Sequence, residues 1–300
     1  MSTQTRWLFE APLAHEVAHY ANPYTSQEYY SNPELEFEST ARVPGRRRRP
    51  AQRQPFFKDS RPLNSAPLKP GTPIAINHKW PVIRRDLAST YNRLGGLMQA
   101  LARMVGIDVP SVLAVWQIES GGRTHTVGRA VIRFENHLFY HHWGRHNEDE
   151  YNHHFRHGGH NGQPGKSWQQ HQFRESVNEP FQNVHTSQAR EYQVLNFAMQ
   201  LAGENPALQS ISIGGPQILV SNYRIIGYTS SRQMFDAFQA SERAHVLGFF
   251  DFCQHNHLLP YLRTQQWVNF AKHYNGPGQA KHYATLLAGA YQQASLLPFS

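Results

Sequence analysis

The chain has 300 residues, a hydrophobic content of 39% and a formal net charge of +8 with histidine counted as neutral. This length and composition allow one large or two small domains with a real core, and the positive charge favours an acidic partner such as nucleic acid, an anionic membrane or a cell-wall polymer. No stretch approaches the roughly 20 apolar residues of a membrane helix, and the single cysteine, Cys253, excludes an intrachain disulfide and is expected to be buried.

Residues 1–78 are predicted to form a proline- and arginine-rich tail. Ten of the 19 prolines lie before residue 74, sustained apolar periodicity is missing, and an acidic stretch is followed by four consecutive arginines, Arg46–Arg49. This composition is typical of an extended or disordered segment, with Trp7-Leu8-Phe9 as a possible docking element. Because the arginine run lies in a tail and not on a recognition helix, we expect no nucleic acid as the main partner.

The remainder, residues 79–300, is predicted to be a mainly α-helical domain. A first helix is expected over 82–105, and the Gly95-Gly96 pair inside it weakens this helix without excluding it. Its apolar residues recur at helical spacing and are Leu87, Tyr91, Leu94, Met98 and Leu101.

A second helix is predicted to begin at the N-cap Asp108 and to end in the sequence Glu119-Ser120-Gly121-Gly122. Val112, Val115, Trp116 and Glu119 fall on one face of this helix. A carboxyl group on an apolar face loses solvation of its charged form, so we expect a raised pKa and a proton held near neutral pH. Glu119 is therefore a candidate general acid, although acidic residues near helix ends are more often ordinary solvated groups.

Between Gly122 and Arg190 the chain is polar, and we expect long irregular excursions with a short β-hairpin near 126–134. Glu148, Asp149 and Glu150 are interpreted as a solvated face. Spacings of three or four residues among the histidines of this segment suit zinc, but no cysteine or flanking acidic residue completes a site. We therefore predict no metal and no cofactor, and a polar loop whose charge grows below about pH 6.5. The histidines are His137, His141, His142, His146, His153, His154, His157 and His160.

The C-terminal half is predicted to be helical throughout. One helix covers 192–202 and is expected to stop at Asn205-Pro206. Ser231 and Ser241 are interpreted as N-caps of two successive helices that end near Asn256. Two further apolar stripes predict helices over 267–274 and 283–290.

Three short motifs follow one another along the chain: Glu119-Ser120-Gly121-Gly122, Gly214-Gly215-Pro216-Gln217 and Tyr274-Asn275-Gly276. In this order they resemble the lysozyme-like superfamily of goose-type lysozymes and lytic transglycosylases, and above all the N-acetylmuramidase domain of phage endolysins and bacterial wall hydrolases. The similarity extends from about residue 95 to 292. Two positions depart from it, because Pro216 removes a backbone donor before Gln217 and Asn136 stands where a basic residue is common.

The resemblance implies a lysozyme-like fold and cleavage of the β-1,4 bond between N-acetylmuramic acid and N-acetylglucosamine in peptidoglycan. It places the catalytic acid at Glu119, with Gln217 lining the sugar groove and Tyr274 and Asn275 facing the acid. Tyr274 also fits a simple core position, since it continues the apolar stripe of its helix.

A second carboxylate is harder to assign from the sequence. Glu135 could position water or brace the cleft, or it could be an ordinary structural carboxylate. Without a second carboxylate within about 5–10 Å of the acid, a single-acid transglycosylase route becomes the alternative, in which the sugar's own hydroxyl attacks.

The first 30 residues contain no hydrophobic signal-peptide core. We therefore expect synthesis in the cytoplasm and action at the cell wall or periplasm after injection, particle delivery or lysis, with the tail as a handle for a phage-like or injection-system particle. A non-catalytic wall-binding component of such a particle is the alternative from a different class of function.

Overall fold

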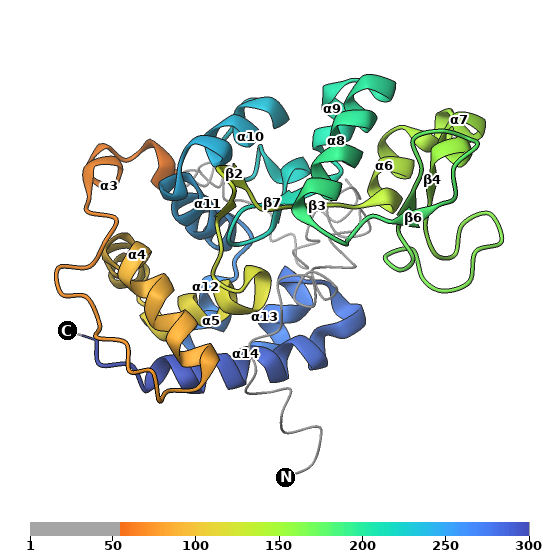
Figure 1. Ribbon diagram of the computed structural model, residues 1–300. Helices are drawn as coiled ribbons and strands as arrows, with labels where there is room; N and C mark the ends of the chain where they lie inside the picture. Colours follow the sequence, from red (N-terminus) through yellow and green to blue (C-terminus); the bar gives the residue numbers. More distant parts are fainter. Residues whose placement is uncertain (1–54, 300) are drawn as a thin grey trace, which may run out of the picture.

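The computed structural model describes residues 55–299 of the chain (Figure 1). The predictions for residues 1–54, including the docking element Trp7-Leu8-Phe9, lie outside the described residues. The predicted mainly α-helical class is confirmed, with three small antiparallel sheets between the helices.

Four helices form the part of the core that carries the first motif. They are α4 (Val82–Val105), α5 (Val109–Ser120), α13 (Trp267–Tyr274) and α14 (Ala280–Ser295). Helix α5 packs against α4 and α14, and α14 also contacts α13 (Figure 1). All four helices were predicted from apolar periodicity. Helix α5 is, however, buried on every side from Ser111 to Ser120, so the single apolar face predicted for it is only part of its buried surface.

The predicted hairpin is confirmed, as β1 (His125–Thr126) pairs with β2 (Arg129–Ala130). The next strand, β3 (Ile132–Phe134), pairs with β7 (Ile211–Ile213), and β7 pairs with β8 (Ile218–Leu219). This second sheet joins segments about 80 residues apart in the sequence, with Ile132 opposite Ile213. It brings the turn that contains Gln217 into the core.

Residues 122–190 are more regular than predicted. They contain α6 (Asn136–His142), η2 (Gly144–His146), α7 (Glu148–His154) and a third sheet of β4 (Phe155–Arg156), β5 (Gln172–Phe173) and β6 (Gln182–Asn183). These elements are too short to produce a periodic apolar pattern, which explains why the sequence suggested irregular structure. The acidic first turn of α7 is exposed, as expected.

Two helix boundaries also differ from the predictions. Helix α8 (Gln188–Ala202) ends at Gly203, and Asn205-Pro206 lies in the next short helix, α9 (Glu204–Leu208), so this pair is not the stop. Proline is tolerated there because the first turn of a helix makes no use of its missing N–H. Helix α10 (Ser231–Ala240) is capped by Ser230 and not by Ser231.

The remaining C-terminal elements follow the predicted order. Ser241 caps α11 (Glu242–His255), and Cys253 is buried in this helix. Three short elements complete the chain, namely η3 (Val220–Asn222), α12 (Leu259–Arg263) and η4 (Pro277–Gln279).

The segment 55–78, predicted as part of the tail, packs on the helical domain through η1 (Phe57–Asp59) and α3 (Arg61–Ser65). Phe57, Leu63 and Ile74 belong to the hydrophobic core. The Phe57 backbone N–H donates to Asp251 Oδ1 at 2.7 Å. These apolar anchors are too widely spaced to give a periodic pattern, and the predicted boundary at residue 79 therefore falls inside the packed unit of the described residues.

We predict that Leu63→Ala lowers the free energy of unfolding by about 2–3 kcal/mol, because it leaves a cavity where the 55–78 segment meets the domain. Urea unfolding followed by circular dichroism measures this change. The matched variant Leu296→Ala removes an exposed side chain and should change stability by about 0.5 kcal/mol or less. Equal effects of the two variants would contradict the docking of this segment.

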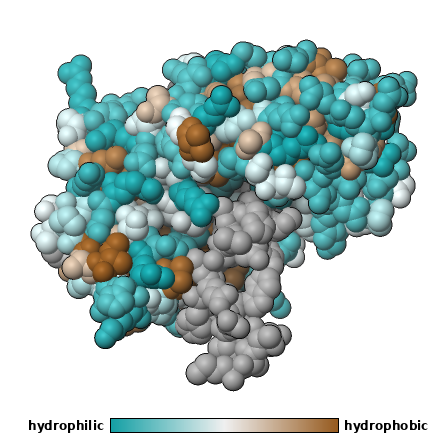
Figure 2. All heavy atoms as spheres, viewed as in Figure 1, coloured by the Kyte–Doolittle hydropathy of each residue, from teal (hydrophilic) through white to brown (hydrophobic). Residues whose placement is uncertain are grey.

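The face shown in Figure 2 is mostly hydrophilic, with separate hydrophobic patches. In the described part of the chain, no helix combines the length and the apolar character that crossing a membrane requires.

Candidate functional site

Glu119 lies in the last turn of α5, and the sequence around this helix fixes where it begins and ends. The Asp108 side chain accepts a hydrogen bond from Ser111 N at 3.0 Å, as expected of an N-cap. At the other end Gly121 adopts the left-handed conformation with φ 61°, which glycine reaches at little cost. Gly122 lies against Thr90 of α4, where a side chain would overlap the threonine. The helix therefore stops directly after the acid.

The Glu119 carboxyl group is 3% exposed and receives a hydrogen bond at Oε1 from Asn275 Nδ2 at 2.7 Å. Burial raises the pKa of Glu119 to about 8, and the Asn275 hydrogen bond opposes this shift by stabilising the carboxylate. At neutral pH the group holds a proton. Because Oε1 accepts from Asn275, Oε2 is the oxygen that can carry this proton.

Helix α13 ends at Tyr274, and Asn275 follows as its C-cap. This end of the helix meets the acid through the Asn275 hydrogen bond. The Tyr274 hydroxyl donates to the carbonyl oxygen of Pro216 at 2.6 Å, while its ring stacks on Phe270 at a centroid distance of 5.0 Å. The ring of Tyr274 is therefore part of the core, and its hydroxyl group holds the turn between β7 and β8. Its predicted position facing the acid stays a prediction. The Oδ1 atom of Asn275 is buried and accepts no hydrogen bond from the described residues.

The β7–β8 turn packs directly on α5. A side chain at Gly215 would overlap the Trp116 ring, so only glycine allows this approach. Gln217 has a positive φ of 49°, and its amide accepts from Ser212 Oγ at 2.8 Å and donates to the Gly214 carbonyl oxygen at 2.7 Å. The side chain thus holds the turn in shape. Its predicted contact with a sugar stays a prediction.

Glu135 lies apart from this group. It is 2% exposed at the start of α6, and its Oε1 atom pairs with Arg133 Nε at 2.7 Å. Burial raises the pKa of Glu135 to about 7, and Arg133 opposes the shift. Its other neighbours are His137 and His171, and no ion pair among residues 55–299 involves Glu119. The structure therefore brings together Glu119, Tyr274 and Asn275, with Gln217 in the adjoining turn, but leaves Glu135 in a separate cluster.

Two residues near the acid were not predicted as part of the site. Arg93 of α4 donates to the Gly122 carbonyl oxygen and pairs with Glu242 at 3.1 Å, and Glu242 also accepts from the Thr124 hydroxyl. This network braces the turn after Glu119. From the sequence Glu242 was expected in the first turn of a helix, but its partners Arg93 and Thr124 lie far away in the chain.

The histidine-rich segment is only partly the polar loop expected from the sequence, since His137 and His157 are buried whereas His146 and His153 are exposed. Burial lowers the pKa of His157 to about 3 and that of His141 to about 4. Glu135, His137 and His171 form a group that could hold a metal ion, although the sequence suggested no acidic residue to complete such a site.

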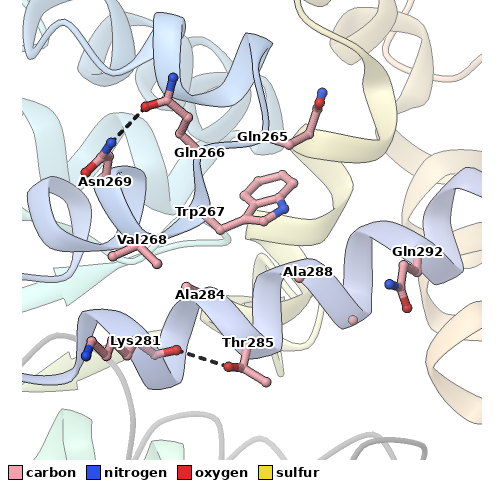
Figure 3. A pocket seen from close by; sticks show the side chains of 11 residues that line it. Gln265, Gln266, Trp267, Val268, Asn269, Lys281, Ala284, Thr285, Ala288 and Gln292 are labelled. Atoms are coloured by element: carbon pink, nitrogen blue, oxygen red, sulfur yellow. Dashed lines mark hydrogen bonds between the residues drawn. The ribbon is translucent and has the colours of Figure 1, made fainter.

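An open groove of about 880 Å³ runs over α13 and α14, away from this chemistry. Figure 3 shows Trp267 between the amide side chains of Gln266 and Asn269 and the α14 residues Ala284 and Thr285. The groove is lined by a single ionisable side chain, Lys281, and contains no acid. It therefore offers contact surface and no proton donor.

Comparison with known proteins identifies the family of the chain. The profile of the Muramidase family, described as N-acetylmuramidase, matches residues 108–295. The crystal structure of Burkholderia AP3 phage endolysin is similar with a TM-score of 0.50 and 26% identity, over 66% of this chain and 70% of that one. No curated protein matches the chain. Since the family match covers more than half of the sequence, the chain belongs to the N-acetylmuramidase family.

Proposed function

We propose that the protein is a peptidoglycan hydrolase that cleaves the β-1,4 bond between N-acetylmuramic acid and N-acetylglucosamine, with Glu119 as the general acid. The observation that carries this proposal is a buried carboxyl group with a pKa of about 8, held by Asn275 at the end of a helix. Membership of the N-acetylmuramidase family and the similarity to a phage endolysin support the same reaction class.

The chemistry needs a proton at the bridging oxygen, because protonation lets the departing sugar leave as a neutral alcohol. Glu119 is protonated at neutral pH and could supply that proton from Oε2. Positive charge then develops at the anomeric carbon of the other sugar. The free Oδ1 atom of Asn275 could accept an N–H or O–H of the substrate or of a water molecule beside the acid.

A lytic transglycosylase reaction is the second candidate, and one specific observation favours it. The described residues form no ion pair with Glu119, and Glu135 belongs to another cluster. A reaction with one acid, in which the sugar's own hydroxyl attacks the anomeric carbon, needs no second carboxylate.

Mass spectrometry of muropeptides released from purified sacculi tests these alternatives. Reducing N-acetylmuramic acid ends would support the proposed hydrolase, whereas anhydro ends would show the transglycosylase reaction. Reducing N-acetylglucosamine ends would contradict the proposed bond. Binding to sacculi without release of soluble fragments would instead support a non-catalytic wall-binding component.

We predict that Asn275→Ala lowers the rate of muropeptide release by on the order of tenfold to a hundredfold, because the acid loses the group that orients it. In the wild type, activity should fall as pH rises through about 8, where Glu119 loses its proton. The Asn275 hydrogen bond lowers the pKa of Glu119, so its removal should move this alkaline limb to higher pH. If Asn275→Ala lowers the rate but leaves the alkaline limb of the pH–activity curve unchanged, or moves it to lower pH, the role proposed for Asn275 is contradicted.

The place of action and the delivery role of the tail stay predictions. Deletion of residues 1–54 tests them, because the packed segment that begins at residue 55 is left intact. The deletion should abolish association with a phage-like or injection-system particle and keep activity on purified sacculi. Particle association and delivery that survive the deletion would contradict the role of the tail.

A further inference from the structure

We infer that Glu135, His137 and His171 form a binding site for a divalent first-row transition-metal ion such as Zn²⁺, separate from the Glu119 site. All three side chains are buried, and one ligand atom from each lies within 4.8 Å of the others. Two imidazoles and one carboxylate are a set that zinc binds readily.

The spacing of the ligand atoms suits one small cation. Glu135 Oε2 lies 3.3 Å from His171 Nδ1 and 3.6 Å from His137 Nδ1. Ligand atoms bound tetrahedrally to zinc at about 2.0–2.1 Å are about 3.3 Å apart. The two carboxylate–imidazole distances are close to this spacing, and all three ligand atoms lie within 4.8 Å of one another.

The hydrogen bonds around the cluster fix the His171 ring, whose Nδ1 atom also lies 3.0 Å from His185 Nε2 and whose Nε2 atom lies 3.3 Å from His137 Nδ1. His171 Nε2 lies 2.9 Å from the Ser167 carbonyl oxygen, which can only accept, so Nε2 carries the hydrogen and Nδ1 of the neutral ring carries the lone pair. A backbone carbonyl that fixes the far side of a histidine ring is the usual outer partner of a metal ligand. Glu135 Oε2 is buried, accepts no hydrogen bond from the described residues and faces this lone pair.

The site would join two parts of the chain that are distant in sequence. Glu135 and His137 lie at the start of α6, and His171 immediately precedes β5. Asn136 already links these parts, since its Nδ2 atom donates to the Gln172 carbonyl oxygen at 2.7 Å. His185 adds a neighbour, with Nε2 3.0 Å from His171 Nδ1. A bound ion would thus fasten the loop before β5 onto α6, which is a structural role.

Metal titration of the full chain after treatment with a chelator tests this inference. Zn²⁺ binding is measured by calorimetry. The chain has 19 histidines, and the exposed ones bind zinc weakly. A weak competing chelator in the buffer therefore suppresses this weak binding and leaves the tight site to be measured. Co²⁺ serves as a second probe, since tetrahedral Co²⁺ has strong visible absorption bands. We expect one tight equivalent per chain, a rise in the melting temperature with Zn²⁺, and a tetrahedral Co²⁺ spectrum.

His171→Asn and His137→Gln should each weaken this binding by on the order of a hundredfold or more, because each removes one ligand atom. His153→Asn is the matched control, since His153 lies in the same histidine-rich segment with its side chain 55% exposed, and it should leave the tight equivalent unchanged. Circular dichroism checks that each variant folds. If one ligand variant does not fold, the zinc affinity of the other ligand variant tests the inference. Absence of a tight equivalent in the wild type, or unchanged affinity in a folded ligand variant, would overturn the inference.

Discussion

Glu119→Gln is expected to reduce the release of soluble muropeptides from sacculi by about 10³-fold, within the range typical of lost general acid catalysis. Glutamine keeps the size of the side chain, and its carbonyl oxygen can still accept the hydrogen bond that Asn275 donates to Oε1. It has no proton that can be transferred to a departing sugar oxygen. The variant therefore removes the chemical function of the residue with little change in packing.

The experiment compares initial rates of muropeptide release at pH 6, where wild-type Glu119 is protonated. Glu148→Gln makes the same chemical change at an exposed position of α7 and should retain wild-type activity. Binding of both variants to sacculi should be similar, because Glu119 is neutral in the active form. Activity of Glu119→Gln within tenfold of the wild type would refute its assignment as the acid.

Local features of the sequence predicted well the helix that carries Glu119. The N-cap Asp108, the apolar spacing of α5 and the two glycines after Ser120 all act over a few residues, and the structure confirms the helix that they define. The expectation of a raised pKa for Glu119 follows from the same apolar surroundings. Its hydrogen bond to Asn275 spans 156 positions, and only the family resemblance brought these two residues together.

Contacts between distant segments account for what the sequence could not predict. Strand β3 pairs with β7 across the region expected to be irregular, and this pairing buries Arg133 beside Glu135. The metal-binding group needs His171, which the sequence does not place near Glu135 because 36 residues separate them. The 55–78 segment likewise depends on isolated anchors such as Phe57, whose backbone partner Asp251 belongs to a helix near the other end of the chain.

The acid also makes stability depend on pH in a direction that can be predicted. The pKa of Glu119 is about 8 in the folded protein against an ordinary value of 4.5. The folded state therefore holds this proton more tightly than the unfolded state. Its contribution to stability is fully present below pH 4.5 and is lost as pH rises through about 8.

We predict that Glu119→Gln, which cannot ionise, is progressively more stable than the wild type as pH rises. Between pH 5 and pH 8 the difference in free energy of unfolding should grow by about 3 kcal/mol, since one pKa unit corresponds to about 1.4 kcal/mol. Urea unfolding of both proteins at several pH values measures this difference. The other buried acids, such as Asp251 and Glu191, are the same in both proteins and cancel in the comparison.

Glu148→Gln again serves as the control, and its stability should run parallel to that of the wild type at every pH. If Glu119→Gln becomes more stable while it loses activity, the buried carboxyl group of the wild type lowers stability and supports function. Such a trade-off is expected of a functional group. Parallel curves for Glu119→Gln and the wild type would mean that the carboxyl group is solvated in solution. In that case the same residue could not hold the proton that the proposed reaction requires at neutral pH.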